Sequence, residues 1–241
     1  MTHSSERTSP EAIQKLKEEA AHSAAAMIED GMIVGLGSGS TAKLVVDAIG
    51  KRVKDGLRLV GIPTSEKTAA QAKELNIPLA TLAQHPRIHL ALDGADEVEV
   101  STLNLIKGGG GNLLREKLVA IASERFVIVV DERKLVDKLG ASFSLPVEVV
   151  PFGWQSTEQR LKELRANPQL RLGPNGEVYI TDGGHYILDC AFGPIASPST
   201  LAQSLDATVG VVEHGLFIGM TSAVVVGQPE GIKLLNAVSP A

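Results

Sequence analysis

Short apolar runs alternate with helical patterns over residues 11–134 of this 241-residue chain. The runs have the length of buried strands and lie at residues 32–36, 57–62, 88–92 and 126–130, while the segments between them carry apolar residues at helical spacing. Strands that alternate with helices pair side by side in one parallel sheet and place helices on its faces. The pattern therefore predicts an α/β fold with a doubly wound, mainly parallel sheet.

The pattern changes after residue 144, where strands begin to outnumber helices. We expect strands at residues 147–150, 178–181, 187–191 and 209–220, with helices at 155–166 and 200–204. Residues 224–227 predict a last strand and 232–235 a short helix that rejoin the large sheet. The predicted domains are therefore residues 1–144 together with 222–241, and a second, smaller α+β domain over residues 145–221.

The first glycine-rich turn between a strand and a helix is Gly37-Ser38-Gly39-Ser40-Thr41. Backbone N–H groups at such a helix N-terminus bind phosphate, and the hydroxyl groups of the turn add donors. A dinucleotide fingerprint would need a glycine where Ser40 stands, and a phosphate loop would need a lysine before Thr41. The turn therefore predicts a phosphate site, with a tight turn capped by serines as the alternative.

Charged residues gather around the second glycine-rich turn. Asp93 and Asp96 follow the strand at 88–92, Lys107 precedes the glycines at 108–111, and Glu116 lies in the first turn of the next helix. Ligands bind at the carboxyl ends of strands in open α/β sheets. We therefore expect these groups to converge on one small ligand; the alternative is a glycine-rich turn beside a solvated Glu–Lys pair.

Composition excludes several classes of partner. The net charge is −5 and no basic block is present, so we expect neither nucleic acid nor an anionic membrane as a partner. Cys190 is the only cysteine, which excludes a disulfide framework and fits a reducing compartment. Residues 1–10 are polar and have no signal-peptide core, and no apolar run reaches the length of a membrane span. We expect a disordered N-terminal tail on a soluble, cytoplasmic protein.

The histidines show no ligand spacing, so we expect no metal site and no cofactor. His185, between Gly184 and Tyr186, is interpreted as a turn residue, and Trp154 as a packing residue.

Four segments together resemble ribose-5-phosphate isomerase, type A. They lie at residues 35–41, 63–68, 92–99 and 107–117, and later segments at 131–134 and 145–151 also match, so the resemblance covers nearly the whole chain. The chain departs from the family pattern at Ser38, at Gly111-Asn112 and at His185. The resemblance implies a large α/β domain with a smaller α+β lid domain, no metal, and a homodimer or tetramer.

The resemblance also implies site residues. By position, substrate contacts fall on Ser38, Gly39, Ser40, Thr41, Asp93, Gly94, Ala95, Asp96, Lys107, Gly108, Gly109, Gly110 and Lys134. Glu116 becomes the proton acceptor in an interconversion of D-ribose 5-phosphate and D-ribulose 5-phosphate, a step of the pentose phosphate pathway.

The residues agree with this chemistry, which passes through an enediolate. Lys107 and the glycine N–H groups are candidates to stabilise its charge. Asp93 is our choice for opening the sugar ring and moving the hydroxyl proton, with Asp96 as its orienter or alternate. A hydride shift on two metals would need a ligand cluster that the sequence pattern lacks.

Two other classes of function stay open. A sugar-phosphate sensor on the same fold would carry a DNA-binding module, for which the ten polar N-terminal residues leave no room. An acyl-CoA transferase-like enzyme would use Glu116 as a nucleophile and would be revealed by a covalent CoA adduct.

Overall fold

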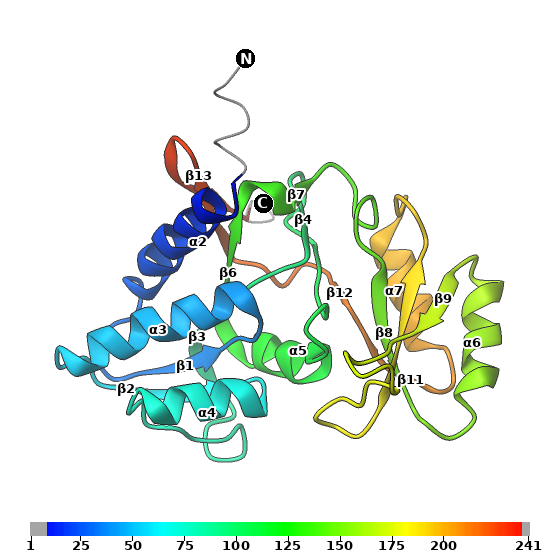
Figure 1. Cartoon of the computed structure of the whole chain (residues 1–241), viewed down its shortest axis with the longest axis horizontal. Coiled ribbons are helices and arrows are strands. Elements are labelled where there is room, and N and C mark those ends of the chain that lie inside the picture. The colour runs from blue at the N-terminus through cyan, green and yellow to red at the C-terminus, as the bar shows by residue number, and fades with distance from the viewer. Residues whose placement is uncertain (1–8, 238–241) are drawn as a thin grey trace. The chain divides into compact units, whose positions relative to one another are not determined.

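The computed structural model describes residues 9–237, which form two compact units (Figure 1). The first unit contains residues up to Gly94, residues 118–135 and the C-terminal part from Met220, and the second contains residues 95–117 and 136–219. The domain boundary at residue 145, which separates residues 1–144 from 145–221 in the sequence analysis, stays a prediction. Residues 1–8, most of the expected N-terminal tail, lie outside the described residues. Within the described residues, every helix is too short or too polar to cross a membrane.

The first unit is built on a six-stranded sheet in the order β14-β13-β6-β3-β1-β2. Its parallel strands are β1 (Met32–Leu36), β2 (Leu59–Pro63), β3 (Ile88–Asp93), β6 (Ser123–Asp131) and β13 (Ala223–Gln228). The edge strand β14 (Gly231–Asn236) runs antiparallel to β13. This confirms the α/β fold with a mainly parallel sheet.

Helices cover both faces of this sheet because its strands are apolar on both sides. Val34 of β1 and Leu90 of β3 belong to the core with α2 (Pro10–Ala25) and α3 (Ser40–Lys54). The next residue along β1, Gly35, points to the opposite face, where a Cβ atom would lie 2.5 Å from Cγ1 of Val119. Val119 belongs to α5 (Leu113–Ile121), and α4 (Glu66–Glu74) follows β2. The sheet is therefore doubly wound.

The second unit contains an antiparallel sheet in the order β11-β8-β10-β9. Its strands are β8 (Leu145–Val149), β9 (Asn167–Leu170), β10 (Tyr186–Ala191) and β11 (Val211–His214). Alternate residues of β8 and β10, including Val147 and Leu188, pack with α6 (Trp154–Glu163) and α7 (Pro198–Asp206). The residues between them, including Glu148 and Asp189, point to the other face. That face carries the polar contacts described below.

Short strands join the glycine-rich turn to this unit. β5 (Leu105–Ile106) pairs with β4 (Glu97–Glu99) and with β12 (Leu216–Phe217), and β7 (Leu135–Val136) completes the small sheet. The 3₁₀ helix η1 (Glu132–Lys134) precedes β7. Helix α5 begins in the second unit and ends in the first.

Some local expectations were wrong. Residues 232–235 form a strand, because the turn before Gly231 (φ +120°) folds them back onto β13 as a hairpin. Residues 178–181 make only one isolated bridge, between Val178 and Leu172. The expected strand over 209–220 is interrupted at Gly215, whose N–H bonds to the carbonyl of Pro146. Trp154 does pack against the core of the second unit.

Candidate active site

The turn after β1 exposes the N-terminus of α3. Gly39 adopts φ +99°, which L side chains rarely adopt, and no side chain caps the first N–H groups of the helix. Ser40 is exposed and Thr41 is half-buried, whereas Ser38 is buried. The Ser38 hydroxyl lies 2.6 Å from that of Thr64. Ser38 therefore stabilises the turn through its contact with Thr64. Ser40, Thr41 and the helix N–H groups are available to an anion.

Asp93 lies directly beside this turn within the first unit. Its Oδ1 accepts hydrogen bonds from the N–H groups of Ser38 (3.1 Å) and Gly94 (2.7 Å), and the residue is only 2% exposed. A Cβ on Gly37 would lie 2.2 Å from this same oxygen, so only glycine allows Asp93 to approach. A Cβ on Gly94 would be 3.6 Å from that of Thr41. The structure thus brings the predicted 38–41 and 93–94 segments together.

A lysine that the sequence interpretation missed also approaches the turn. Lys17 of α2 places Nζ 3.5 Å from Oγ of Ser40 and 3.9 Å from Oδ2 of Asp131. Burial acts to raise the pKa of Asp131, but hydrogen bonds and charge from Arg133, with Lys17, hold it below its ordinary value. Asp131 is therefore a carboxylate that keeps Lys17 in place. The predicted Lys134 lies at the end of η1, half-buried, in the same unit.

In the second unit, Lys107 and Glu116 form a buried ion pair. Nζ of Lys107 lies 3.2 Å from Oε2 of Glu116, and the side chains are 3% and 4% exposed. Leu113 and Ala120, which share a helical face with Glu116 by their spacing, are buried as well. The Lys107 ammonium is also 5.6 Å from the ring centroid of the buried Phe217. In such a pair the carboxylate can exchange a proton with a small ligand, and the ammonium can stabilise negative charge on that ligand.

The glycine turn between them is held from one side by Asp96. The N–H of Gly109 donates to Oδ2 of Asp96 (2.8 Å), and a Cβ on Gly109 would lie 2.6 Å from Oδ1. Gly109 and Gly110 are exposed, and Gly108 is buried. The Asn112 carbonyl accepts from the N–H of Glu116, while its side-chain amide donates to the Gly110 carbonyl. Asp96 therefore orients the turn, with Ala95 just before it in the same unit.

Side chains of the segment 171–185 contact this turn and the start of α5, and the sequence pattern did not reveal them. Arg171 donates to the carbonyls of Gly108 and Gly109, and the Tyr179 hydroxyl donates to that of Gly110. Arg171 pairs in turn with Asp189 of β10. Arginine and tyrosine more than sixty residues away leave no local motif, so only the fold reveals them.

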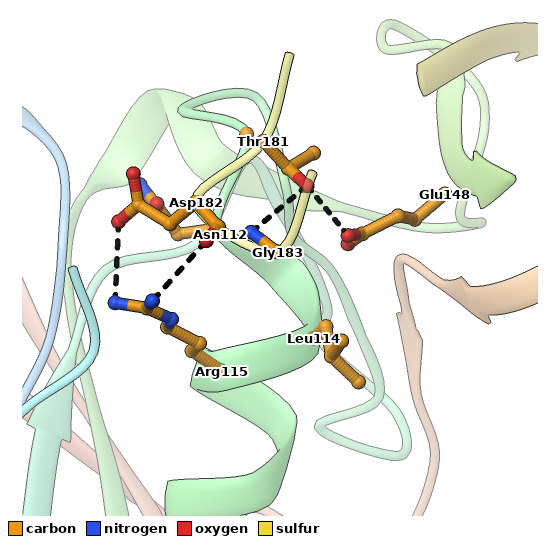
Figure 2. Close-up of a pocket in the computed structure, with 8 residues that line it drawn as sticks. Asn112, Leu114, Arg115, Glu148, Thr181, Asp182 and Gly183 are labelled. Atoms are coloured by element: carbon orange, nitrogen blue, oxygen red, sulfur yellow. Dashed lines mark hydrogen bonds and ion pairs between the residues drawn. The ribbon is translucent and has the colours of Figure 1, made fainter. Parts of the chain in front are cut away.

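A small pocket lies at the N-terminus of α5 (Figure 2). It is lined by Gly111, Asn112, Leu114, Arg115, Glu148, Thr181, Asp182 and Gly183. Arg115 pairs with Asp182 (3.4 Å), and the buried Glu148 accepts from the Thr181 hydroxyl (2.8 Å). Nδ1 of His185 lies 2.9 Å from Oε1 of Glu148, and the Thr181 N–H donates to the His185 carbonyl. His185 is thus a turn residue that anchors the turn to Glu148.

One group in the described part of the chain has the spacing of metal ligands: Asp206, Glu213 and His214. Nζ of Lys117 is 2.5 Å from Oε1 of Glu213 and donates to the His214 carbonyl, so a positive charge already occupies the cluster. Burial, and then the nearby Lys117 ammonium, lower the pKa of His214 to about 4, against the opposing effect of Glu213. Burial also lowers the pKa of Lys117, against the opposing effect of Glu213. This cluster does not fit a divalent cation well.

The chain matches known proteins over most of its length. Residues 60–231 match the family model of ribose 5-phosphate isomerase A (phosphoriboisomerase A). The chain is 54% identical to ribose-5-phosphate isomerase A of a Synechococcus strain and 56% identical to that of Gloeobacter violaceus. Each match covers 92% of this chain, together with 97% of the Synechococcus protein and 96% of the Gloeobacter protein.

Solved structures give the same result. The ribose 5-phosphate isomerase A of Methanocaldococcus jannaschii superposes with a TM-score of 0.89 at 41% identity, covering 92% of this chain and 99% of that one. A D-ribose-5-phosphate isomerase in complex with phospho-erythronic acid superposes with a TM-score of 0.90 at 40% identity, covering 93% and 99%. The chain belongs to the ribose 5-phosphate isomerase A family.

Proposed function

We propose that this chain interconverts D-ribose 5-phosphate and D-ribulose 5-phosphate by proton transfer through an enediolate, as a step of the pentose phosphate pathway. The observation that carries the proposal is the buried ion pair between Lys107 and Glu116 in a member of this family. The two residues flank the glycine turn, of which Gly109 and Gly110 are exposed. Phospho-erythronic acid, bound in the related structure, carries a phosphate and a planar carboxylate. A planar carboxylate resembles the planar, negatively charged enediolate in shape and charge.

We assign the proton transfer to Glu116. Its carboxylate takes the proton from C2 and returns it at C1, which one group can do because the enediolate is planar. The Lys107 ammonium lies 3.2 Å from Glu116, where it can stabilise charge on the substrate oxygens while the carboxylate removes the proton. Preorganised charge of this kind is often the largest single contribution to catalysis.

We assign the ring opening and the movement of the hydroxyl proton to Asp93. Two backbone N–H groups hold its carboxylate in one orientation. The hydrogen bond from the Gly109 N–H supports an orienting role for Asp96. We assign substrate contacts to Gly94, Ala95 and the glycines 108–110.

We assign the phosphate to the N-terminus of α3, with contacts from Gly39, Ser40 and Thr41 and support from Ser38. Lys17, whose ammonium lies 3.5 Å from Ser40, joins Lys134 as a source of positive charge. Helix N-termini and lysines attract phosphate by complementary charge.

The deciding experiment is the conversion of ribose 5-phosphate to ribulose 5-phosphate by the purified protein in excess EDTA. We expect full activity, because the assigned groups move protons without a metal. Loss of activity in EDTA that added divalent metal restores would contradict the metal-free route. No conversion with or without metal would contradict the assigned function.

We also propose that the protein acts in the cytoplasm as a homo-oligomer, a dimer or a tetramer. Large apolar side chains that are exposed, such as Phe152 (95%) and Val209 (72%), are of the kind that a subunit contact buries. Light scattering during size-exclusion chromatography gives the number of subunits, and a monomeric mass would contradict the proposal.

A further inference from the structure

We propose that Arg171 is a positioning residue of the isomerase reaction: it holds the glycine turn 108–110 so that the N–H of Gly110 is presented to the substrate oxyanion. The inference rests on the proposed function and adds to it a residue outside the catalytic segments. Three neighbouring contacts carry it, all within the second unit.

The Arg171 guanidinium bridges a strand and the glycine turn. Its Nε donates to Oδ2 of Asp189 at 2.9 Å and its Nη2 donates to Oδ1, which makes the pair bidentate. Its Nη1 donates to the carbonyls of Gly108 at 2.9 Å and Gly109 at 3.2 Å. The side chain is only 12% exposed. A planar fork of donors fits this geometry, and a lysine ammonium cannot reproduce it.

Tyr179 completes the contact. Its ring centroid lies 5.9 Å from the Arg171 guanidinium carbon, and its hydroxyl donates to the Gly110 carbonyl at 3.3 Å. A Cβ on Gly111 would lie 2.2 Å from the tyrosine oxygen, so the backbone of the turn rests against this side chain. The carbonyls of Gly108, Gly109 and Gly110 therefore all accept hydrogen bonds from Arg171 or Tyr179.

The direction of these carbonyls determines the direction of the N–H groups. In a trans peptide the C=O of one residue and the N–H of the next point in opposite directions, and none of the described peptide bonds is cis. The N–H of Gly109 donates to Asp96, and that of Gly111 donates to the Gly108 carbonyl. Among the described residues, no protein group accepts from the N–H of Gly110, which is exposed.

The N–H of Gly110 is therefore a preorganised donor on the side of the turn opposite Arg171. It stands on the segment that joins Lys107 to the helix of Glu116, so it is suited to meet the charge that develops on an enediolate oxygen. A donor of this kind accelerates the reaction only while its direction is fixed before the charge appears.

The test compares Arg171→Lys and Arg171→Met with the wild-type protein. Arg171→Lys keeps a positive charge beside Asp189 but cannot span the carboxylate and two carbonyls. We expect kcat to fall about 10- to 100-fold in both variants, somewhat less than the loss of a whole oxyanion donor. The KM for ribose 5-phosphate should change less than about threefold, because the contact matters most in the transition state. Affinity for phospho-erythronic acid should fall in parallel with kcat/KM.

Arg52→Met is the matched control. Arg52 also donates to two backbone carbonyls, those of Ala25 and Ile28, but in the first unit. Its replacement should lower the melting temperature and leave kcat unchanged. If Arg52→Met lowers kcat as much as Arg171→Met does, the effect is one of stability and the inference fails.

Two further outcomes decide the remaining cases. If Arg171→Met does not fold, Arg171→Lys and Tyr179→Phe decide; Tyr179→Phe keeps the ring and loses one neutral hydrogen bond, so kcat should fall about 2- to 10-fold. Wild-type kcat in both of these variants would overturn the inference. A wild-type protein that does not isomerise ribose 5-phosphate would instead overturn the proposed function.

Discussion

At the scale of single residues, Glu116 combines features that a surface carboxylate lacks. It is 4% exposed and lies 3.2 Å from an equally buried ammonium. It also lies in the first turn of the helix that follows the exposed Gly109 and Gly110. Burying an ion pair is costly unless the geometry is good, and removing one partner is more costly still. A buried pair beside the proposed active-site turn is best explained by its chemistry.

Replacing Glu116 by glutamine keeps the side-chain volume and removes the proposed base. We expect turnover to fall by more than about 100-fold, since a general base typically contributes ~10²–10⁴-fold. Binding of phospho-erythronic acid should persist, measured by titration calorimetry beside kcat. Glu124→Gln, at an exposed position on β6, is the control and should keep full activity. A Glu116→Gln protein with more than about a tenth of wild-type kcat, which is ~1.4 kcal/mol of barrier, would exclude Glu116 as the base.

At the scale of elements, the N-terminus of α3 is the proposed seat of the phosphate. Thr41 lies in its first turn and is half-buried, so Thr41→Val removes a donor and keeps the shape. A hydrogen bond to a charged group contributes ~1.5–3 kcal/mol, so the KM for ribose 5-phosphate should rise about 10- to 100-fold. The fall in kcat should be smaller, because ground and transition states share the contact. Steady-state kinetics on both proteins measure this difference.

Thr102→Val is the matched control, because it makes the same substitution at an exposed position in the second unit, outside the assigned contacts. Its KM should match that of the wild type. An unchanged KM in Thr41→Val, or a crystal complex with phosphate at the glycines 108–111, would mean that the substrate lies reversed in its site.

The elements that could be predicted from the sequence are those with a local signal. The turns at 37–41 and 108–111 each follow a short apolar run, and the buried face of α5 follows from helical spacing. Lys17 and Arg171 could not be predicted from the sequence, because they reach the turns from elements that are distant in sequence. The strand at 232–235 was not predicted, because the hairpin partner determines the secondary structure of such a short apolar run and its own pattern does not.

At the scale of the whole molecule, the net charge of −5 opposes a phosphorylated sugar. Attraction must then come from local groups, and the structure supplies them in both units: Lys17 beside the turn of α3, and Lys107 beside Glu116. Each of these lysines stands close to a buried carboxylate. Such pairing holds a flexible ammonium in place before the substrate arrives, which lowers the entropy lost on binding.

The stability of the molecule should depend on pH through His214, which is 3% exposed. Its Nδ1 accepts from the N–H of Leu216, and its Nε2 lies 3.1 Å from Oδ1 of Asp206. Burial, and then the nearby Lys117, lower its pKa to about 4 from an ordinary value of 6.5, against the opposing effect of Glu213. Above pH 6.5 neither the folded nor the unfolded state binds this proton. Between 6.5 and about 4 the unfolded chain binds it and the folded protein does not.

The free energy of unfolding should therefore decrease as pH falls through this window, by about 3 kcal/mol for this group at ~1.4 kcal/mol per pH unit. His214→Asn should remove that part of the pH dependence, whatever constant stability it loses through its hydrogen bonds. Urea unfolding at intervals from pH 7.5 to pH 4 measures the difference between the two proteins, with His22→Asn, at an exposed position on α2, as the control. Parallel curves for wild type and His214→Asn would show that His214 binds its proton equally well in the folded protein, and that Lys117 and burial do not keep it neutral.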